Sequence, residues 1–270
     1  MITMNLRLSL LRSFLHLAKA YCVYEWYLRN QLDQNKMPKH VGIIMDGNRR
    51  WAKERALHYK LGYSIGADRV EQLLDWCFLD LKIQSITVYV LSSENLQRAR
   101  DELNDLLDVI EERLWKLYYN RKLDQQEIRV KAIGEIDSLP YRIRQVIRKL
   151  EEKTDNYSKH YLNIAIAYGG RIEMVECIRK IAERVFNDEL RPSEINERLI
   201  EHYLYTCHLP NPDPDLIIRT SGEERLSGFL IWQSAYSELI FTDTMWPEFR
   251  KIDFLRAIRS YQTRQRRFGR

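Results

Sequence analysis

The chain has 270 residues, of which 45% are hydrophobic and 30% are charged, and its formal net charge is +5. A chain of this length and composition can bury a substantial core, which excludes a disordered or collagen-like protein. The excess of 43 Lys and Arg over 38 Asp and Glu is too small to indicate a nucleic-acid partner. No segment has the roughly 18 uncharged apolar residues of a membrane-spanning helix.

The four cysteines, Cys22, Cys77, Cys177 and Cys207, form no C-x-x-C pair, and the chain contains no H-E-x-x-H motif. The sequence therefore predicts no zinc site. Each cysteine lies in an apolar stretch, which predicts reduced, buried thiols in a cytoplasmic protein.

The segment 4–32 is dense in apolar residues that basic residues interrupt. One helical face would carry Leu6, Leu10, Phe14, Leu17 and Tyr21, so an amphipathic helix is expected. It can pack on the protein's own surface, or it can lie on a membrane with basic groups toward the headgroups. The polar run 33–36 predicts a linker, which divides the chain into an extension (1–36) and a main domain (37–270).

From residue 41 the chain alternates short apolar runs with longer segments of helical periodicity. Strands are expected at 41–45, 86–91, 128–133, 161–167, 216–218, 229–231 and 239–241, and helices at 64–81, 101–123, 141–151, 172–186, 193–204 and 251–266. This alternation predicts an α/β fold with a central, mostly parallel sheet flanked by helices. Such sheets bind ligands at the carboxyl ends of their strands, and the polar motifs of this chain follow its expected strands.

The first expected strand ends in Met45-Asp46-Gly47-Asn48-Arg49-Arg50. Backbone N–H groups at a helix start, with arginines beside them, suit a phosphate, and Asp46 could hold a Mg²⁺ that bridges it. The alternative is an ordinary turn with a capping Asp and surface arginines.

Two further motifs follow strands. Ser92-Ser93-Glu94-Asn95, with Arg98 and Glu102 downstream, has the residue types of a binding loop and equally those of a helix N-terminus. For Tyr168-Gly169-Gly170-Arg171-Ile172-Glu173 a tight strand-to-helix turn is the favoured interpretation.

The richest segment is Arg219-Thr220-Ser221-Gly222-Glu223-Glu224-Arg225-Leu226-Ser227, at the end of an apolar strand. A buried strand end rarely carries an arginine without an anionic partner. That partner is either a bound anion or Glu223 and Glu224. Because neither G-x-x-x-x-G-K-[ST] nor G-x-G-x-x-G is present, the sequence points away from a nucleotide and toward an apolar molecule that carries a diphosphate.

These motifs, in this order, resemble those of the cis-prenyltransferases, the family of undecaprenyl and dehydrodolichyl diphosphate synthases. The resemblance covers about residues 38–270 and rests on the motifs at 46–52, 92–95, 168–171, 218–227, 232–233, 235–239, 241–243, 246–249 and 267–269. It implies a homodimeric enzyme that condenses isopentenyl diphosphate with an allylic prenyl diphosphate. Each new double bond would be Z, an apolar tunnel would hold the product, and the product would serve as a glycosyl carrier lipid.

The resemblance also implies roles for individual residues. Catalysis would rest on Asp46 and Asn95, and Mg²⁺ on Asp46 and Glu238. The allylic diphosphate would be bound by Gly47, Asn48, Arg49, Arg50 and Trp51. Substrates would be positioned by Ser92, Ser93, Glu94, Arg98 and Glu102. Isopentenyl diphosphate would be bound by Arg219, Arg225 and Ser227, and by Arg267 and Gly269 reaching from a neighbouring subunit.

The chain departs from the family pattern after the first motif. Where the family often has a basic residue and, four positions later, a His, this chain has Tyr59 and Tyr63. Loss of two basic groups favours an alternative enzyme with a short product or a non-standard prenyl acceptor. Two more functions compete with the standard reaction: a subunit of a heteromeric prenyltransferase, and a basic module that binds RNA or anionic membranes.

Overall fold

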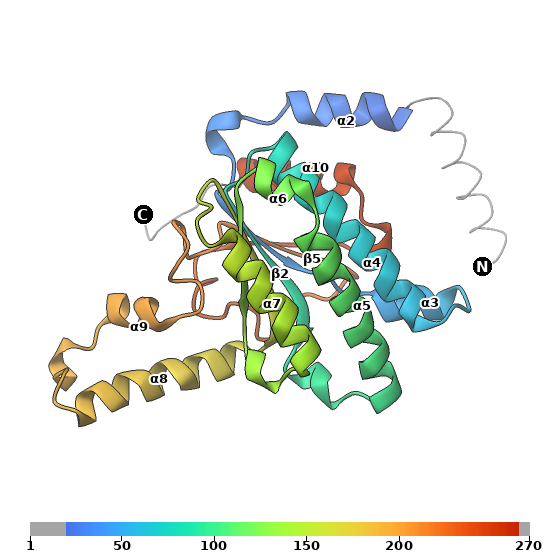
Figure 1. Ribbon diagram of the computed structural model, residues 1–270. Helices are drawn as coiled ribbons and strands as arrows, with labels where there is room; N and C mark the ends of the chain where they lie inside the picture. The colour runs from blue at the N-terminus through green and yellow to red at the C-terminus, as the bar shows by residue number, and fades with distance from the viewer. Residues whose placement is uncertain (1–19, 265–270) are drawn as a thin grey trace. The chain divides into compact units, whose positions relative to one another are not determined.

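The computed structural model describes residues 20–264, and within that range it contains a six-stranded, all-parallel sheet (Figure 1). Its order is β3-β4-β2-β1-β5-β6. The strands are β1 (His40–Ile44), β2 (Ser85–Ser92), β3 (Ile128–Ile133), β4 (His160–Tyr168), β5 (Leu216–Arg219) and β6 (Glu238–Phe241). The predicted α/β fold with a parallel sheet flanked by helices is confirmed.

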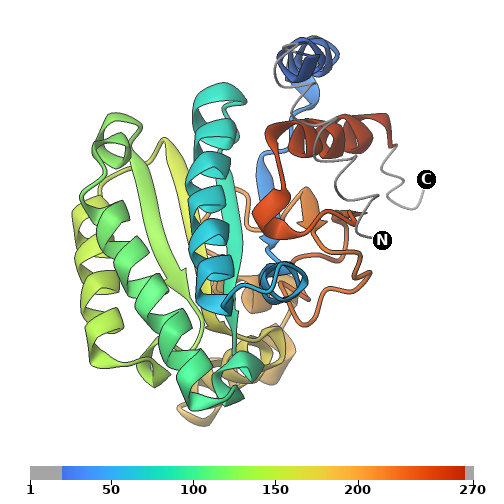
Figure 2. The same ribbon diagram turned by 90° about the vertical axis from the view of Figure 1, so that its right-hand side faces the viewer.

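Helices connect the strands and cover the sheet. They are α2 (Ala20–Asn30), α3 (Asn48–Glu54), α4 (Tyr59–Leu74), α5 (Arg100–Tyr118), α6 (Arg121–Gln125), α7 (Tyr141–Thr154), α8 (Gly170–Phe186), α9 (Glu197–Tyr203) and α10 (Lys251–Thr263). A π-helical turn, η2 (Asp75–Asp80), extends α4, and a 3₁₀ turn, η3 (Glu94–Gln97), precedes α5. Figures 1 and 2 show α4, α5 and α7 side by side on one face of the sheet.

Six of the seven expected strands are present, and the one expected at 229–231 is wrong. Phe229 and Leu230 are fully buried, but they lie in a turn, and Leu230 has a positive φ of 44°. Their apolar character reflects packing in the cluster that also contains Ile44, Ala165 and Tyr168. An apolar run of three residues cannot distinguish a buried turn from a strand.

The expected helices are present with shifted ends. The one expected at 64–81 begins earlier, at Tyr59, where the His58 Nδ1 atom accepts a hydrogen bond from the Lys60 N–H. The one expected at 101–123 is divided at Asn120, whose side chain caps α6 by accepting from the Lys122 N–H.

The chain forms two compact units. One is Pro38–Glu248, which contains the sheet; the other is Met1–Met37 with Phe249–Arg270, of which residues 20–37 and 249–264 are described. In this second unit α2 packs on α10. Lys251 Nζ lies 2.6 Å from Glu25 Oε1, and Arg259 Nη1 donates to Gln31 Oε1 at 2.9 Å.

The N-terminal segment is described only from residue 20, so most of the expected helix at 4–32 lies outside the described residues. The expected linker at 33–36 contains a short 3₁₀ turn at Gln34–Lys36. Within residues 20–264 no helix is both long and apolar enough to cross a membrane. The expectation of four buried thiols is half wrong, because Cys22 and Cys207 are exposed while Cys77 and Cys177 are buried.

The central strands position the functional motifs. β1 is buried along its whole length and pairs with β2 on one side and β5 on the other. Because all strands are parallel, the segments that follow β1, β2, β4 and β5 meet at one edge of the sheet. The register pairs Ile44 with Arg219 at the ends of β1 and β5, so the Asp46 and Arg219 motifs are neighbours.

Candidate active site

The turn after β1 is built around Gly47, which has a φ of 101° and is the N-cap of α3. A side chain would be strained at this φ, and its Cβ would lie 2.8 Å from Ser221 Oγ. The Gly47 N–H donates to Asp46 Oδ1 at 2.7 Å. Glycine therefore lets the loop after β1 approach the loop after β5 closely.

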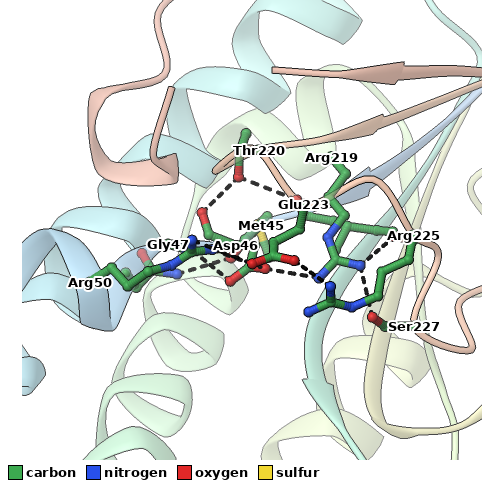
Figure 3. Close-up of polar contacts among 11 residues, drawn as sticks. Met45, Asp46, Gly47, Arg50, Arg219, Thr220, Glu223, Arg225 and Ser227 are labelled. Carbon is green, nitrogen blue, oxygen red and sulfur yellow. Dashed lines mark hydrogen bonds and ion pairs between the residues drawn. The ribbon is translucent and has the colours of Figure 1, made fainter. Parts of the chain in front are cut away.

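Asp46 and Arg219 meet between these two loops (Figure 3). Arg219 Nη2 donates to Asp46 Oδ2 at 2.9 Å, and Arg219 Nη1 donates to Ser227 Oγ at 2.8 Å and to the Arg225 carbonyl. The Thr220 hydroxyl donates to the Asp46 carbonyl at 2.7 Å. Arg219 is only 4% exposed, so its position is fixed before any substrate arrives.

Glu223 bridges two arginines that belong to the two motifs. Its Oε1 lies 3.5 Å from Arg50 Nη1, and its Oε2 accepts from Arg225 Nη1. Arg225 is 63% exposed and Arg50 46%, so both can reach a bound anion. Of the two acids that the sequence offered as partners, Glu223 pairs with Arg225, whereas Arg219 pairs with Asp46 instead.

Asn48 is held by close packing of α3 on α4. Its Nδ2 donates to the Met45 carbonyl at 3.0 Å, while Oδ1 is buried without a partner within residues 20–264. A Cβ at Gly62 would lie 2.6 Å from the Asn48 carbonyl, and one at Gly66 would collide with Asn48 Oδ1. Two glycines four residues apart on one helical face therefore set the position of Asn48.

A second polar cluster surrounds Glu102, in the first turn of α5. Its Oε1 accepts from the Tyr63 hydroxyl at 2.8 Å and lies 3.2 Å from both Arg98 Nη1 and Arg49 Nε. Arg98 Nη1 also donates to the Tyr63 hydroxyl at 2.8 Å. Burial raises the pKa of Tyr63, which keeps the phenol neutral.

The two clusters border a cavity of about 1810 Å³ between the sheet and helices α4 and α5. Such a volume exceeds the roughly 300–1,000 Å³ of ordinary small-molecule pockets. Polar residues line one end, among them Asp46, Asn48, Arg50, Asn95, Arg98 and Arg219. The part beyond is lined by apolar side chains, among them Val70, Leu74, Phe78, Leu106, Ile110, Leu114 and Ile164, and also by charged ones such as Glu71, Arg113 and Lys122.

The motif after β2 also lines this cavity. Ser92, Ser93, Glu94 and Asn95 all contribute to its wall. The Ser92 hydroxyl accepts from the Asn95 N–H at 3.2 Å, which is the local bond expected at a helix start. The capping and binding interpretations of this motif are thus compatible.

The motif after β4 has a structural role. Tyr168 Oη donates to Glu173 Oε2 at 2.5 Å, and Glu173 Oε1 accepts from the Tyr205 N–H and from Gln233 Nε2 at 2.7 and 2.9 Å. Burial raises the pKa of Glu173. The favoured interpretation, a tight turn, is confirmed, because α8 begins directly after Gly169.

Trp51 and Glu238, both expected in the site, do not line this cavity. Trp51 is nearly buried: Arg55 stacks on its ring, and its Nε1 donates to Glu248 at 3.4 Å, so it supports α3. Glu238 begins β6, at the amino edge of the sheet and away from Asp46, so one chain does not gather both carboxylates around one ion. Arg267 and Gly269 lie outside the described residues.

Some residues of the site were not singled out by any sequence motif. Thr220 was noted only as one member of the segment 219–227. The cavity-facing side of α5 was indicated only by helical periodicity. A signal for the α3–α4 contact was present, since Gly62 and Gly66 are spaced by four residues.

Comparison with known proteins identifies the family. The Prenyltransf family model, which describes undecaprenyl diphosphate synthases, matches residues 44–269. The chain belongs to this family. It is 50% identical over 254 residues to the Methanopyrus kandleri protein named tritrans,polycis-undecaprenyl-diphosphate synthase (geranylgeranyl-diphosphate specific), covering 94% of this chain and 93% of that one. The Methanocaldococcus jannaschii protein of the same name is 48% identical, covering 92% and 88%.

Solved structures of prenyltransferases share the fold. Lavandulyl diphosphate synthase from Lavandula x intermedia, in complex with dimethylallyl diphosphate, has a TM-score of 0.84 and 35% identity. The match covers 87% of this chain and 100% of that one. The chain is a cis-prenyltransferase, of the enzyme class that joins isopentenyl diphosphate to an allylic diphosphate.

Proposed function

We propose that this prenyltransferase extends geranylgeranyl diphosphate with isopentenyl diphosphate to a long polyprenyl diphosphate with Z double bonds. The relatives named above are described as specific for geranylgeranyl diphosphate, and they match nearly the whole chain. The observation that carries the proposal is the contact of Asp46 with Arg219 at the polar end of the large cavity. That contact brings together the two loops for which we propose anion binding.

The chemistry requires stabilisation of a departing diphosphate. Ionisation of the allylic substrate separates a carbocation from a multiply charged leaving group, and fixed positive groups favour that separation. Gly47, Asn48 and Arg50 at the start of α3 would hold the allylic diphosphate. Arg219, Arg225 and Ser227 would hold isopentenyl diphosphate, and its double bond would attack the cation. Asn95 would position the substrates between them.

Asp46 suits a Mg²⁺ ion. Mg²⁺ in phosphate-transferring sites is usually held by one or two carboxylates together with substrate phosphates. Asp46 offers one partly exposed carboxylate beside the anion-binding loops, and residues 20–264 contain no cluster of three Asp, Glu, His or Cys side chains that could hold an ion by themselves. When bound, the ion would neutralise charge on the leaving diphosphate. Arg219 would then keep Asp46 oriented toward the substrate.

The apolar part of the cavity suits the hydrocarbon tail. Each buried five-carbon unit contributes roughly 3–4 kcal/mol at about 0.8 kcal/mol per methylene-sized group. The wall formed by Leu106, Ile110 and Leu114 follows one face of α5 away from the diphosphate end. Growth of the product would proceed along this helix. The use of the product as a glycosyl carrier lipid belongs to the same proposal.

A homodimer is supported by an exposed apolar face on α8. Val175, Ile178 and Phe186 are 45%, 60% and 87% exposed and share one side of the helix. Contiguous exposed apolar residues often mark protein interfaces. In such a dimer Arg267 and Gly269 would complete the isopentenyl site of the neighbouring subunit, and Glu238 would contribute to Mg²⁺ binding.

Peripheral membrane contact through residues 4–32 is supported by the outer side of α2. While one face of α2 packs on α10, Val23, Trp26 and Tyr27 are 64%, 66% and 48% exposed. Aromatic residues of this kind favour the interface between water and lipid. The basic residues of the segment would face anionic headgroups.

The test is incubation of the purified full-length chain with geranylgeranyl diphosphate, labelled isopentenyl diphosphate and Mg²⁺, with product chromatography. A long product with Z double bonds is expected. A short product, or transfer to another acceptor, would favour the alternative suggested by Tyr59 and Tyr63. Activity only after addition of a second protein would favour the heteromeric enzyme.

A further inference from the structure

The hydroxyl of Tyr63 occupies a central place in the cluster around Glu102. It donates to Glu102 Oε1 and accepts from Arg98 Nη1, each at 2.8 Å. Tyr63 is 7% exposed, so water does not readily replace either bond. A phenol can donate one hydrogen bond and accept another at the same time, and Tyr63 uses both capacities.

These contacts join three separate elements at the polar end of the cavity. Tyr63 lies on α4, Arg98 follows η3, and Glu102 lies in the first turn of α5. Arg49 on α3 also reaches Glu102. The negative charge of Glu102 is thereby matched by two arginines, and Arg98 is held in one orientation beside the segment that carries Asn95.

We propose that Tyr63 is a positioning residue for prenyl transfer, whose hydroxyl holds the Arg98–Glu102 pair in the orientation that aligns the substrates. This inference rests on the proposed function, because it assigns Arg98 and Glu102 to substrate positioning. Tyr63 acts through these two residues, and its own ring need not contact a diphosphate.

This chain has Tyr63 where the family often has a His, and the two side chains differ in how they respond to pH. A free imidazole titrates near pH 6.5, so a His at this position could gain a proton as the pH is lowered, whereas the neutral phenol does not change charge at physiological pH. The charged groups that face Tyr63 are Arg49 on α3, Arg98 after η3 and Glu102 on α5, and the neighbouring aromatic group on its own helix is Tyr59. Protonation of an imidazole here would remove the acceptor that Arg98 uses.

The experiment compares Tyr63→Phe and Tyr63→His with a matched control, Tyr141→Phe, in the full-length enzyme with geranylgeranyl and isopentenyl diphosphates. Tyr141 is 67% exposed on α7, so its variant controls for loss of a phenol elsewhere. Tyr63→Phe should lower kcat on the order of ten- to a hundredfold, since hydrogen bonds to charged groups are about that strong. Tyr63→His should restore activity at pH 8 and lose it as the pH is lowered through the pKa of the imidazole, an acid-dependent loss of kcat that the unmodified enzyme lacks.

Thermal unfolding of each variant separates positioning from stability. The inference is supported if Tyr63→Phe loses activity at an unchanged melting temperature and Tyr63→His shows the new acidic limb in kcat. It is overturned if Tyr63→Phe retains kcat, or if both variants lose activity only in proportion to lost folded protein. If the unmodified chain transfers no prenyl group, the proposed function itself is contradicted. If the unmodified chain is active but the Tyr63 variants behave as just described, only the role of Tyr63 is contradicted.

Discussion

Asp46 and Arg219, separated by 173 residues in the chain, share a 2.9 Å contact at the ends of adjacent parallel strands. The contact joins the loop proposed for the allylic diphosphate to the loop proposed for isopentenyl diphosphate. A single carboxylate therefore has two roles: it compensates the buried guanidinium, and it is the proposed ligand of Mg²⁺.

Asp46→Asn tests both roles together. The amide oxygen can still accept from Arg219, so the melting temperature should change little, while weaker Mg²⁺ binding should lower kcat/KM by on the order of a hundredfold or more. Steady-state kinetics across a Mg²⁺ titration checks this. Binding to membranes or RNA should be unaffected, and retention of full activity would contradict the assigned role of Asp46.

The two arginines after β5 should respond differently to substitution. Arg225→Ala removes an exposed side chain, so it should raise KM for isopentenyl diphosphate on the order of a hundredfold at unchanged stability. Arg219→Ala should also lower the free energy of unfolding, because it removes a buried side chain together with its hydrogen bonds to Asp46, Ser227 and the Arg225 carbonyl. Kinetics and denaturant unfolding of both variants check the difference. Equal stability losses would contradict the observed burial of Arg219.

Product length should follow position along α5. With a rise of 1.5 Å per residue, Ile110 lies about 12 Å and Leu117 about 22 Å beyond Glu102. Ile110→Trp should therefore give shorter products than Leu117→Trp, at an overpacking cost of roughly 1–3 kcal/mol each. Product chromatography checks the order. Glu112→Trp, with a side chain 69% exposed on the same helix, is the control.

Stability should fall as the pH is lowered from about 6.5 toward 4. Burial lowers the pKa of His40 from 6.5 to about 4, so between these values the unfolded chain binds a proton that the folded chain does not. The shift corresponds to roughly 3 kcal/mol, which is present above pH 6.5 and is lost as the pH approaches 4. His208, with its pKa lowered to about 4 by burial, should add to the effect.

Denaturant unfolding at several pH values checks this dependence. His40→Gln should flatten part of the slope between pH 6.5 and 4, whatever its effect at pH 8. His202→Gln, at an exposed position on α9, is the control for replacement of an imidazole by an amide. A slope in His40→Gln as steep as in the unmodified protein would contradict the assignment.

The sheet was predictable because each of its strands contains a short run rich in apolar residues and these runs alternate with segments of helical periodicity. The run at 229–231 was wrongly assigned as a strand. Its apolar residues indicate burial, but burial does not determine backbone conformation. Likewise, the polar motifs identified which residues belong at the sheet edge, but not their partners. Arg219 was expected to pair with a bound anion or a nearby Glu, and its contact with Asp46 depends on β1 and β5 being neighbours, which periodicity does not specify.

The role of Tyr63 was visible only as a departure from a family pattern. Its neighbours Arg98 and Glu102 were recognised from their own motif, but helix α4 had to be placed against α5 before the three could be joined. Trp51 shows the reverse case. Its motif suggested a contact with substrate, but in the structure it is nearly buried on α3, where it packs against Arg55 and Glu248.

The order of the strands bears on how the enzyme becomes active during its synthesis. β1 is made early, whereas β5, its neighbour in the sheet, emerges only after some 170 further residues. A ribosome-bound chain that ends before β5 would lack two strands of the sheet, β5 and β6, and the contact of Asp46 with Arg219. Contacts of such long sequence separation also slow folding. Catalytic competence should therefore arise late and abruptly, once the last third of the chain has been translated.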